Sequence, residues 1–126
     1  MRLLVGTDSV HTTAAICDYL DPRLTETDEV RVVATAEPGD GTAERDAREA
    51  LNVAPVRLAG AGSVETKFRE GEAVPELLEA AATVDADEIV VGASSAGSEA
   101  AVGSTTRALL ERTSRPVVVV PVPALE

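Results

Sequence analysis

Hydrophobic and polar positions follow two alternating periods along this chain. Short runs rich in Val, Leu and Ile predict strands at residues 2–7, 29–35, 64–69, 88–91 and 117–120. Between these runs, apolar residues at helical spacing predict helices at about 12–20, 42–54, 74–81 and 105–113. Because strands and helices alternate throughout, the pattern predicts an α/β fold with an open parallel sheet and helices on both faces.

Local signals mark where the helices begin and end. Asp8 and Ser9 follow the first strand and are suitable caps for the first helix. Pro55 is expected to end the second helix, whereas Pro75 fits the first turn of the third, where a missing N–H costs nothing. Residues 56–62 follow neither period, so the sequence predicts no structure for them.

The carboxyl ends of the strands are the expected place for a ligand, at the point where the strand order reverses. Thr7-Asp8, Thr35 and the segment from Gly92 to Ser104 lie at that edge. The last segment contains Gly97 and Gly103 as well, and it leads into a helix start where free N–H groups attract phosphate. Two interpretations stay open, namely a phosphate-binding loop and a plain connection that ends in a Ser104 cap.

Composition limits the class of protein. A chain of 126 residues with 44% hydrophobic residues suits one globular domain spanning 1–126. Aromatic residues make up only 2%, so the core has to be built from aliphatic side chains. No apolar run approaches the roughly 20 residues of a membrane span, and no signal-peptide pattern opens the sequence. We therefore expect a cytoplasmic protein.

The net charge of the chain limits the kinds of partner that it can bind. Asp and Glu number 22 against 11 Lys and Arg, for a net charge of −11. Such a surface repels phosphate backbones and anionic lipids, which argues against nucleic-acid and membrane binding. Lys67 is the single lysine, and an acidic, lysine-poor, alanine-rich composition is typical of proteins that work in high salt. We therefore expect a halophilic source.

Residues that could carry catalysis are scarce. Cys17 is the only cysteine and lies on an apolar helix face, which favours a buried structural thiol and excludes an intramolecular disulfide. His11 has no partner visible in the sequence and is expected to be exposed and without a function. The sequence holds no nucleophile–base pair and no phosphate-binding Gly-Lys-Ser/Thr motif, so we expect no enzyme. A phospho-accepting receiver domain is set aside, because Asp8 has no acidic neighbour and the last strand ends in Pro121 instead of Lys.

Several segments together resemble the universal stress protein family. They are LLVGTDS near the start, VETKFREGEAVPELLEAAATVDADEIVVGAS, the helix start GSTT, and RPVVVV near the end. The resemblance covers nearly the whole chain. It implies a doubly wound sheet of five parallel strands in the order 3-2-1-4-5, similar to the adenine nucleotide alpha hydrolase fold. It also implies a homodimer formed through the last strand, Val117–Val120, and in one branch a bound ATP.

The nucleotide motif of that family matches this chain in part. The motif is Gly, two residues, Gly, nine residues, Gly, then Ser or Thr. Gly92 matches its first glycine, and Gly103 with Ser104 matches its end, but the interval between them is two residues shorter. Ser95 stands where the second glycine belongs, with Gly97 as a nearby substitute. Glu99 adds a carboxylate that would repel phosphate.

Further contact positions follow from the same resemblance. Asp8 matches an aspartate near the nucleoside, and Thr35 falls where the family offers a valine to the adenine. Thr7, Val91 and Thr105 match neighbouring contacts. The resemblance therefore implies an adenine nucleotide, ATP or AMP, with or without Mg²⁺, as a regulatory ligand of a stress-response dimer. The alternative keeps the fold and the dimer as a protein-interaction module that binds no nucleotide.

The net charge yields the first testable prediction. The free energy of unfolding should rise with salt, because salt screens the mutual repulsion of the acidic groups. Thermal unfolding in low and in multimolar KCl measures this. A midpoint that does not increase would remove the halophilic interpretation.

Overall fold

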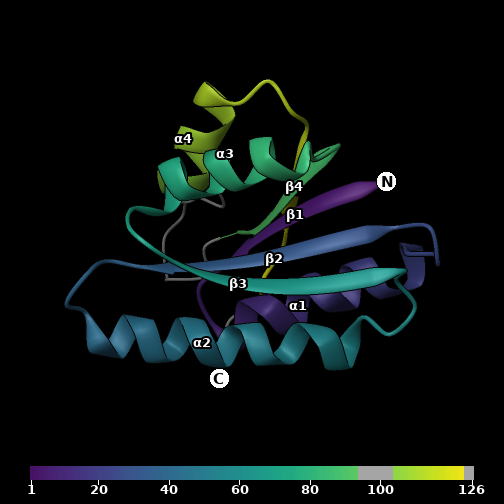
Figure 1. The fold of residues 1–126 in the computed structure, drawn as a ribbon, viewed down its shortest axis with the longest axis horizontal. Coiled ribbons are helices and arrows are strands. Elements are labelled where there is room, and N and C mark those ends of the chain that lie inside the picture. The colour runs from purple at the N-terminus through teal and green to yellow at the C-terminus, as the bar shows by residue number, and fades with distance from the viewer. Residues whose placement is uncertain (94–103, 124–126) are drawn as a thin grey trace.

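The computed structural model describes residues 1–93 and 104–123, and all five expected strands and four expected helices are present in it (Figure 1). A short 3-10 helix at Asp21–Arg23 follows α1. The elements in chain order are β1 (Arg2–Thr7), α1 (Val10–Leu20), β2 (Glu29–Ala36), α2 (Gly41–Arg57), β3 (Ser63–Glu70), α3 (Ala73–Val84), β4 (Glu88–Gly92), α4 (Ser104–Arg112) and β5 (Val117–Val120).

The strands form one parallel sheet in the order β3-β2-β1-β4-β5, which confirms the expected fold class. The central strand β1 pairs with β2 on one side and with β4 on the other. The chain therefore reverses its direction of winding between β1 and β4. The carboxyl ends of these strands lie at the same edge of the sheet, where a crevice is expected.

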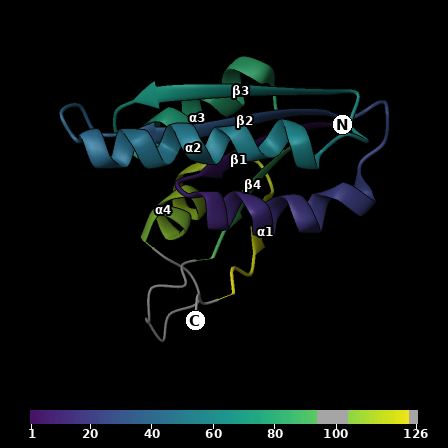
Figure 2. The same ribbon diagram turned by 90° about the horizontal axis from the view of Figure 1, so that it is seen from below.

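Helices cover both faces of the sheet, with α1 and α2 on one face and α3 and α4 on the other (Figures 1 and 2). Residues of β1 alternate between the two cores, since Leu3 and Val5 pack with the α1 and α2 side chains and Leu4 packs with those of α3 and α4. Both cores are almost entirely aliphatic, as the scarcity of aromatic residues predicts. Burial on both faces explains why the strands appear in the sequence as continuous apolar runs.

The first helix begins with a side-chain cap. The Ser9 hydroxyl accepts a hydrogen bond from the Thr12 backbone N–H at 3.1 Å. The helix starts at Val10, two residues before the expected start. It buries Ile16, Leu20 and Cys17, whose side chain is 2% exposed.

The second helix continues past Pro55 to Arg57, so the expectation that Pro55 ends it is wrong. Proline at this position lacks the N–H that would donate to the Leu51 carbonyl, so the helix continues with one hydrogen bond fewer. Leu51 and Ala54 are buried and pack this last turn against the sheet. The Leu58 N–H donates a hydrogen bond to the Ala54 carbonyl at 3.0 Å and ends the helix. Tertiary packing therefore outweighs the local cost of the proline.

The third helix shows the apolar face that the sequence predicts. Leu77, Ala80 and Ala81 are buried. Val74 and Leu78 are partly buried against the same core. Ion pairs from Arg69 to two glutamates of this helix hold it beside β3, at 2.7 Å to Glu76 and 2.9 Å to Glu79.

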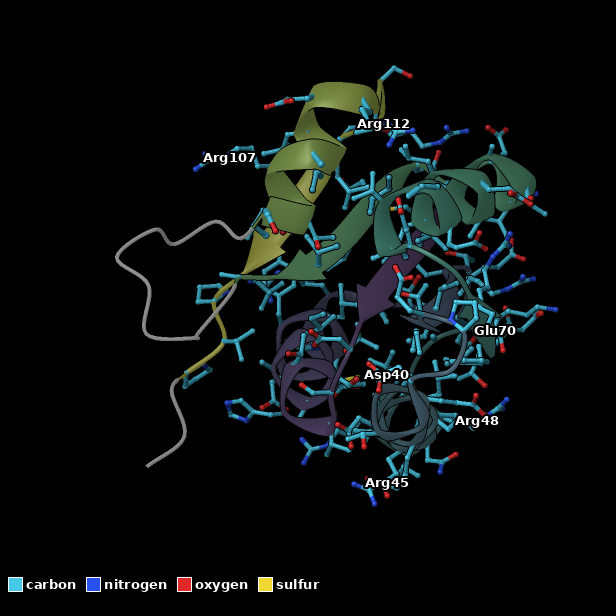
Figure 3. All side chains as sticks on the ribbon, turned by 90° about the vertical axis from the view of Figure 1, so that its left-hand side faces the viewer. Asp40, Arg45, Arg48, Glu70, Arg107 and Arg112 are labelled. Atoms are coloured by element: carbon cyan, nitrogen blue, oxygen red, sulfur yellow. The ribbon has the colours of Figure 1, made fainter. Side chains whose placement is uncertain are left out.

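Charged side chains project outward from the helices, as Figure 3 shows for Arg45 and Arg112. The Arg48 guanidinium instead lies over the Phe68 ring, 4.3 Å from its centroid. Burial raises the pKa of the Cys17 thiol to about 11, so this thiol stays protonated at neutral pH. Among the described residues, no helix is long and apolar enough to cross a membrane.

Residues 56–62, which the sequence leaves unassigned, finish α2 and form a tight turn into β3. Leu58 is buried and ends the helix. The Gly62 N–H donates to the Asp28 carbonyl at 2.9 Å. A Cβ atom on Gly62 would stand 2.1 Å from the Glu26 carbonyl oxygen, so this position has room for glycine alone.

This turn supplies a prediction with a matched control. Gly62→Ala should lower the free energy of unfolding by about 2 kcal/mol, because the backbone at residues 26–28 has to move. Gly60→Ala should change it by less than about 0.5 kcal/mol, since the atom nearest to its added Cβ is 4.0 Å away. Urea unfolding of both variants measures the difference, and equal values would contradict this geometry.

Candidate functional site

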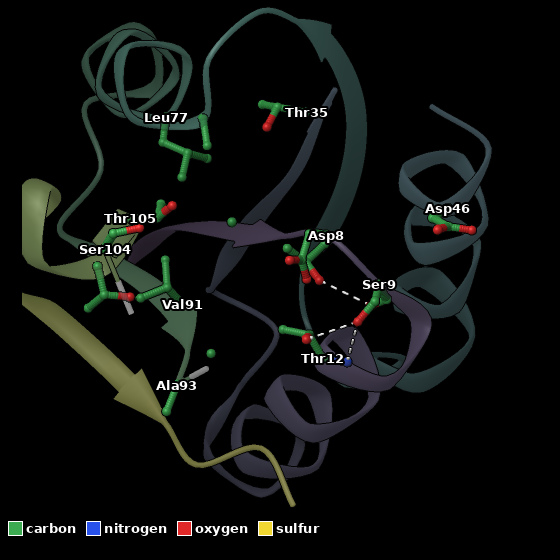
Figure 4. Close-up of a pocket in the computed structure, with 15 residues that line it drawn as sticks. Asp8, Ser9, Thr12, Thr35, Asp46, Leu77, Val91, Ala93, Ser104 and Thr105 are labelled. Atoms are coloured by element: carbon green, nitrogen blue, oxygen red, sulfur yellow. Dashed lines mark hydrogen bonds between the residues drawn. The ribbon is translucent and has the colours of Figure 1, made fainter. Parts of the chain in front are cut away.

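A pocket of about 530 Å³ opens at the carboxyl ends of β1, β2 and β4 (Figure 4). It lies at the edge and at the winding reversal that the fold predicts. Loops and helix starts from both faces of the sheet complete its walls. The residues that line it are Gly6, Thr7, Asp8, Ser9, Thr12, Thr35, Asp46, Ala73, Leu77, Val91, Gly92, Ala93, Ser104, Thr105 and Thr106.

Seven of the nine site residues expected from the sequence therefore come together in one pocket. They are Thr7, Asp8, Thr35, Val91, Gly92, Ser104 and Thr105. The other two, Gly97 and Gly103, lie outside the described residues, as do Ser95 and Glu99. The seven come from the ends of three strands and the start of α4.

The hydroxyl of Thr7 is engaged within the protein. Its Oγ1 lies 2.8 Å from Thr13 Oγ1 and donates to the Ser9 carbonyl at 3.3 Å. Thr13 Oγ1 in turn donates to the same carbonyl at 2.9 Å. These bonds fix the turn from β1 into α1. Thr7 therefore shapes the pocket wall, while its hydroxyl serves the turn.

Asp8 follows on the same turn with an exposed side chain. The sequence allows it to be either a helix cap or a ligand contact. The structure gives the capping role to Ser9, whose hydroxyl accepts from the Thr12 N–H and donates to Thr12 Oγ1 at 3.0 Å. The Asp8 carboxylate faces the pocket (Figure 4) and is available to accept hydrogen bonds there.

One wall of the pocket is apolar. Leu77 packs so closely on β1 that a Cβ atom on Gly6 would stand 2.8 Å from its Cδ1. Ala73 and Val91 continue this wall, and the half-buried Thr35 lies at its rim. An apolar surface beside polar groups at a rim can hold a flat aromatic ring and its hydrogen-bonding edge.

The start of α4 lies beside this apolar wall (Figure 4). Ser104 is its first residue, and Thr105 follows with an exposed side chain. Free backbone N–H groups and the helix dipole at such a start attract an anion. Among the described residues, this is where the pocket is suited to a phosphate group.

Gly92 has a packing role that the sequence does not reveal. A Cβ atom there would stand 2.7 Å from a Thr12 methyl carbon and 2.8 Å from a Val122 methyl carbon. The chain after β5 thus lies against the rim of the pocket. It is held there by a hydrogen bond between His11 Nε2 and the Pro123 carbonyl, a partner that the sequence does not show. That contact joins residues 112 positions apart, which a local pattern cannot indicate.

The charge in the pocket is negative. Asp8 contributes one carboxylate and Asp46 of α2 a second, while none of the described lining residues is Lys or Arg. Sequence reasoning misses Asp46, because it sits within a helix that the sequence links to no loop of the site. Thr12, Ala73 and Leu77 lie within helices too and are missed as lining residues for the same reason, whereas Ser9 is recognised in the sequence only as a cap.

Comparison with known proteins gives a consistent result. The sequence model of the Universal stress protein family matches residues 1–121. None of the curated proteins compared matches the chain.

Three similar solved structures carry adenine nucleotides by their descriptions. A universal stress protein in complex with cAMP is 24% identical, with a TM-score of 0.73 and 98% of each chain covered. The universal stress protein from Archaeoglobus fulgidus in complex with dAMP is 21% identical, with a TM-score of 0.68 and coverage of 95% of this chain and 97% of that one. A family member from Arabidopsis thaliana with AMP bound is 12% identical, with a TM-score of 0.71 and coverage of 98% and 93%.

Proposed function

This chain belongs to the universal stress protein family, and we propose that it is a cytoplasmic, homodimeric stress-response protein that binds an adenine nucleotide as a regulatory ligand. The proposed role is binding and not catalysis. The observation that carries it is the pocket at the winding reversal, which an apolar wall and the start of α4 line together. Three similar structures hold cAMP, dAMP and AMP, which supports adenine as the base.

The walls suggest how the nucleotide would lie. The adenosine would sit between the Thr7-Asp8 turn and Thr35, with its ring against the apolar wall. A carboxylate accepts hydrogen bonds from hydroxyl groups, so Asp8 is suited to a contact with the ribose. The phosphate would lie over Gly92 and the Ser104-Thr105 start of α4, where backbone N–H groups supply the attraction.

A metal ion has a limited place in this arrangement. Within the described residues, no group of three or more His, Cys, Asp or Glu side chains could hold one. Mg²⁺ prefers to keep several waters and to bind phosphate oxygens. It would therefore enter with ATP, on the phosphates of the nucleotide.

A second candidate function is a protein-interaction module of the same fold that binds no nucleotide. The two carboxylates of the pocket, together with the shortened glycine segment, favour this candidate. Both candidates share the dimer, so they differ only in the ligand.

The dimer is proposed to form through the open edge of β5. The Ile89 N–H donates to the Pro116 carbonyl and the Ala93 N–H to the Val120 carbonyl, at 2.9 and 2.8 Å. Because backbone groups alternate sides along a parallel strand, Val117 and Val119 direct theirs toward the open edge. Within the described sheet, β5 is an edge strand made of four valines. Such an edge is a site for pairing, and a twofold copy would cover it.

The ligand proposal is tested by titration calorimetry with AMP and Mg-ATP at matched salt. Thr105→Glu should weaken binding at least tenfold, since it puts a carboxylate at the phosphate position while a glutamate near a helix start leaves α4 stable. Ser114→Glu adds the same charge at an exposed position outside the pocket and should bind as the parent protein does. If no nucleotide gives a heat at millimolar concentration, the interaction module is the correct function.

The dimer is tested by a substitution that changes the open edge alone. Val119→Pro removes an N–H that points away from β4, so it should give a monomer with an intact fold. Val119→Thr keeps both the N–H and the branched shape and should stay dimeric. Light scattering at micromolar concentration measures both variants. A monomeric parent protein would contradict the proposal.

A further inference from the structure

We propose that Arg69 is a positioning residue of the nucleotide pocket. Its ion pairs with Glu76 and Glu79 hold the first half of α3, which carries part of the apolar wall assigned to the adenine ring. The inference rests on the proposed function, because it concerns how the same site keeps its shape. Arg69 itself does not line the pocket, so it acts through the helix.

The first half of α3 is the part of the helix that borders the pocket. Ala73 is its first residue and Leu77 lies one turn later, and both line the pocket. Leu77 extends from the helix toward the strand ends (Figure 4), where a Cβ atom on Gly6 would stand 2.8 Å from its Cδ1. The position of this half of the helix therefore sets the space between the apolar wall and the end of β1.

Arg69 reaches this helix from β3, the outer strand of the sheet. Its Nε lies 2.7 Å from Glu76 Oε1, and its Nη2 lies 2.9 Å from Glu79 Oε1. The two carboxylates are three positions apart on the helix and therefore share one face. A planar guanidinium that bonds both of them restrains the rotation of α3 as well as its distance from β3.

The turn between β3 and α3 packs against the same ion pair. Gly71 has a φ of +140°, and a Cβ atom there would stand 3.0 Å from Glu76 Oε2. The Gly71 N–H donates to the Ala36 carbonyl at 2.9 Å. Arg69 is also the register partner of Thr35, which lies at the rim of the pocket. The pair therefore closes the corner where β2, β3 and α3 meet, next to that rim.

The start of α3 depends on such contacts because it lacks a side-chain cap. The Glu72 side chain at the N-cap position makes no capping hydrogen bond. The Arg69 and Glu76 side chains are 19% and 23% exposed, so water screens their attraction only in part. An exposed ion pair contributes little, whereas a forked arginine that joins two carboxylates at low exposure restrains its neighbours.

The test compares Arg69→Met with Arg31→Met by calorimetric titration with AMP. Arg31 pairs with Glu65 at 3.0 Å on the same face of the sheet, lies nearer the amino ends of the strands, and does not line the pocket. Each substitution keeps a long side chain and removes one guanidinium. Arg69→Met should weaken AMP binding about fivefold, because the wall is no longer held in the arrangement that binds. Arg31→Met should bind AMP as the parent protein does.

A measurement without ligand separates positioning from a loss of stability. In methyl-labelled protein, the nuclear Overhauser effect between the Leu77 methyl groups and the Gly6 α protons reports how closely the wall lies on β1. This effect should weaken in Arg69→Met and stay unchanged in Arg31→Met. A purely stabilising role would lower the unfolding midpoint and the fraction of protein that binds, and it would leave the dissociation constant unchanged.

Two further variants test whether the ion pairs act as a unit. Arg69→Lys keeps the charge, but an ammonium group lacks the planar fork, so its AMP affinity should fall between those of the parent and Arg69→Met. Adding Glu76→Gln to Arg69→Met should change the affinity little, because the interaction is already lost.

Each contrary result has a distinct meaning. AMP affinity in Arg69→Met equal to that of the parent would overturn the positioning role while the proposed function stands. An equal loss in Arg31→Met would overturn it as well, because net charge would then account for the effect. If Arg69→Met does not fold, Arg69→Lys decides, and parental affinity in that variant overturns the inference. Absence of AMP binding to the parent would overturn the proposed function and this inference together.

Discussion

Everything in this molecule is arranged around β1, a strand buried on both faces and paired on both edges. Its hydrogen bonds to β2 and β4 place the winding reversal beside its carboxyl end. Leu3 and Val5 fix one layer of helices and Leu4 the other. Because a right-handed crossover on each side carries the chain away from this point, the space beyond Thr7 and Asp8 stays open. The pocket is therefore a consequence of topology.

Most of the fold is predictable from the sequence because its strands are apolar runs and its helices show a clear period. The order of the strands in the sheet does not follow from these patterns, because residues such as Val30 and Ile89 would suit any central strand. The family resemblance is what implies the order. Pro55 shows the limit of local signals, because buried Leu51 and Ala54 hold the helix turn that proline would weaken. The structure of residues 56–62 cannot be predicted from the local sequence, because their turn depends on a tertiary contact. In that contact Gly62 packs against the Glu26 carbonyl.

The residues of the candidate site also include some that the sequence predicts and some that it does not. Asp8, Thr35 and Ser104 are predictable, because strand ends and helix starts are recognisable in sequence and must meet at one edge of the sheet. Asp46 and Leu77 enter from helices, and the sequence alone does not show which helix residues will border the crevice. The bond between His11 and the Pro123 carbonyl is equally hidden, because it joins the two ends of the chain.

The pocket and the open edge of the sheet are mechanically joined. Gly92 lines the pocket, pairs with Val120 of β5, and lies against both Thr12 and Val122. Ala93 also lines the pocket, and its N–H bonds to the Val120 carbonyl at 2.8 Å. Close packing transmits small displacements, because the interior has little free volume to absorb them. A shift of the pocket rim at Gly92 therefore has to be accommodated by the end of β5, the strand whose edge is open to a second copy.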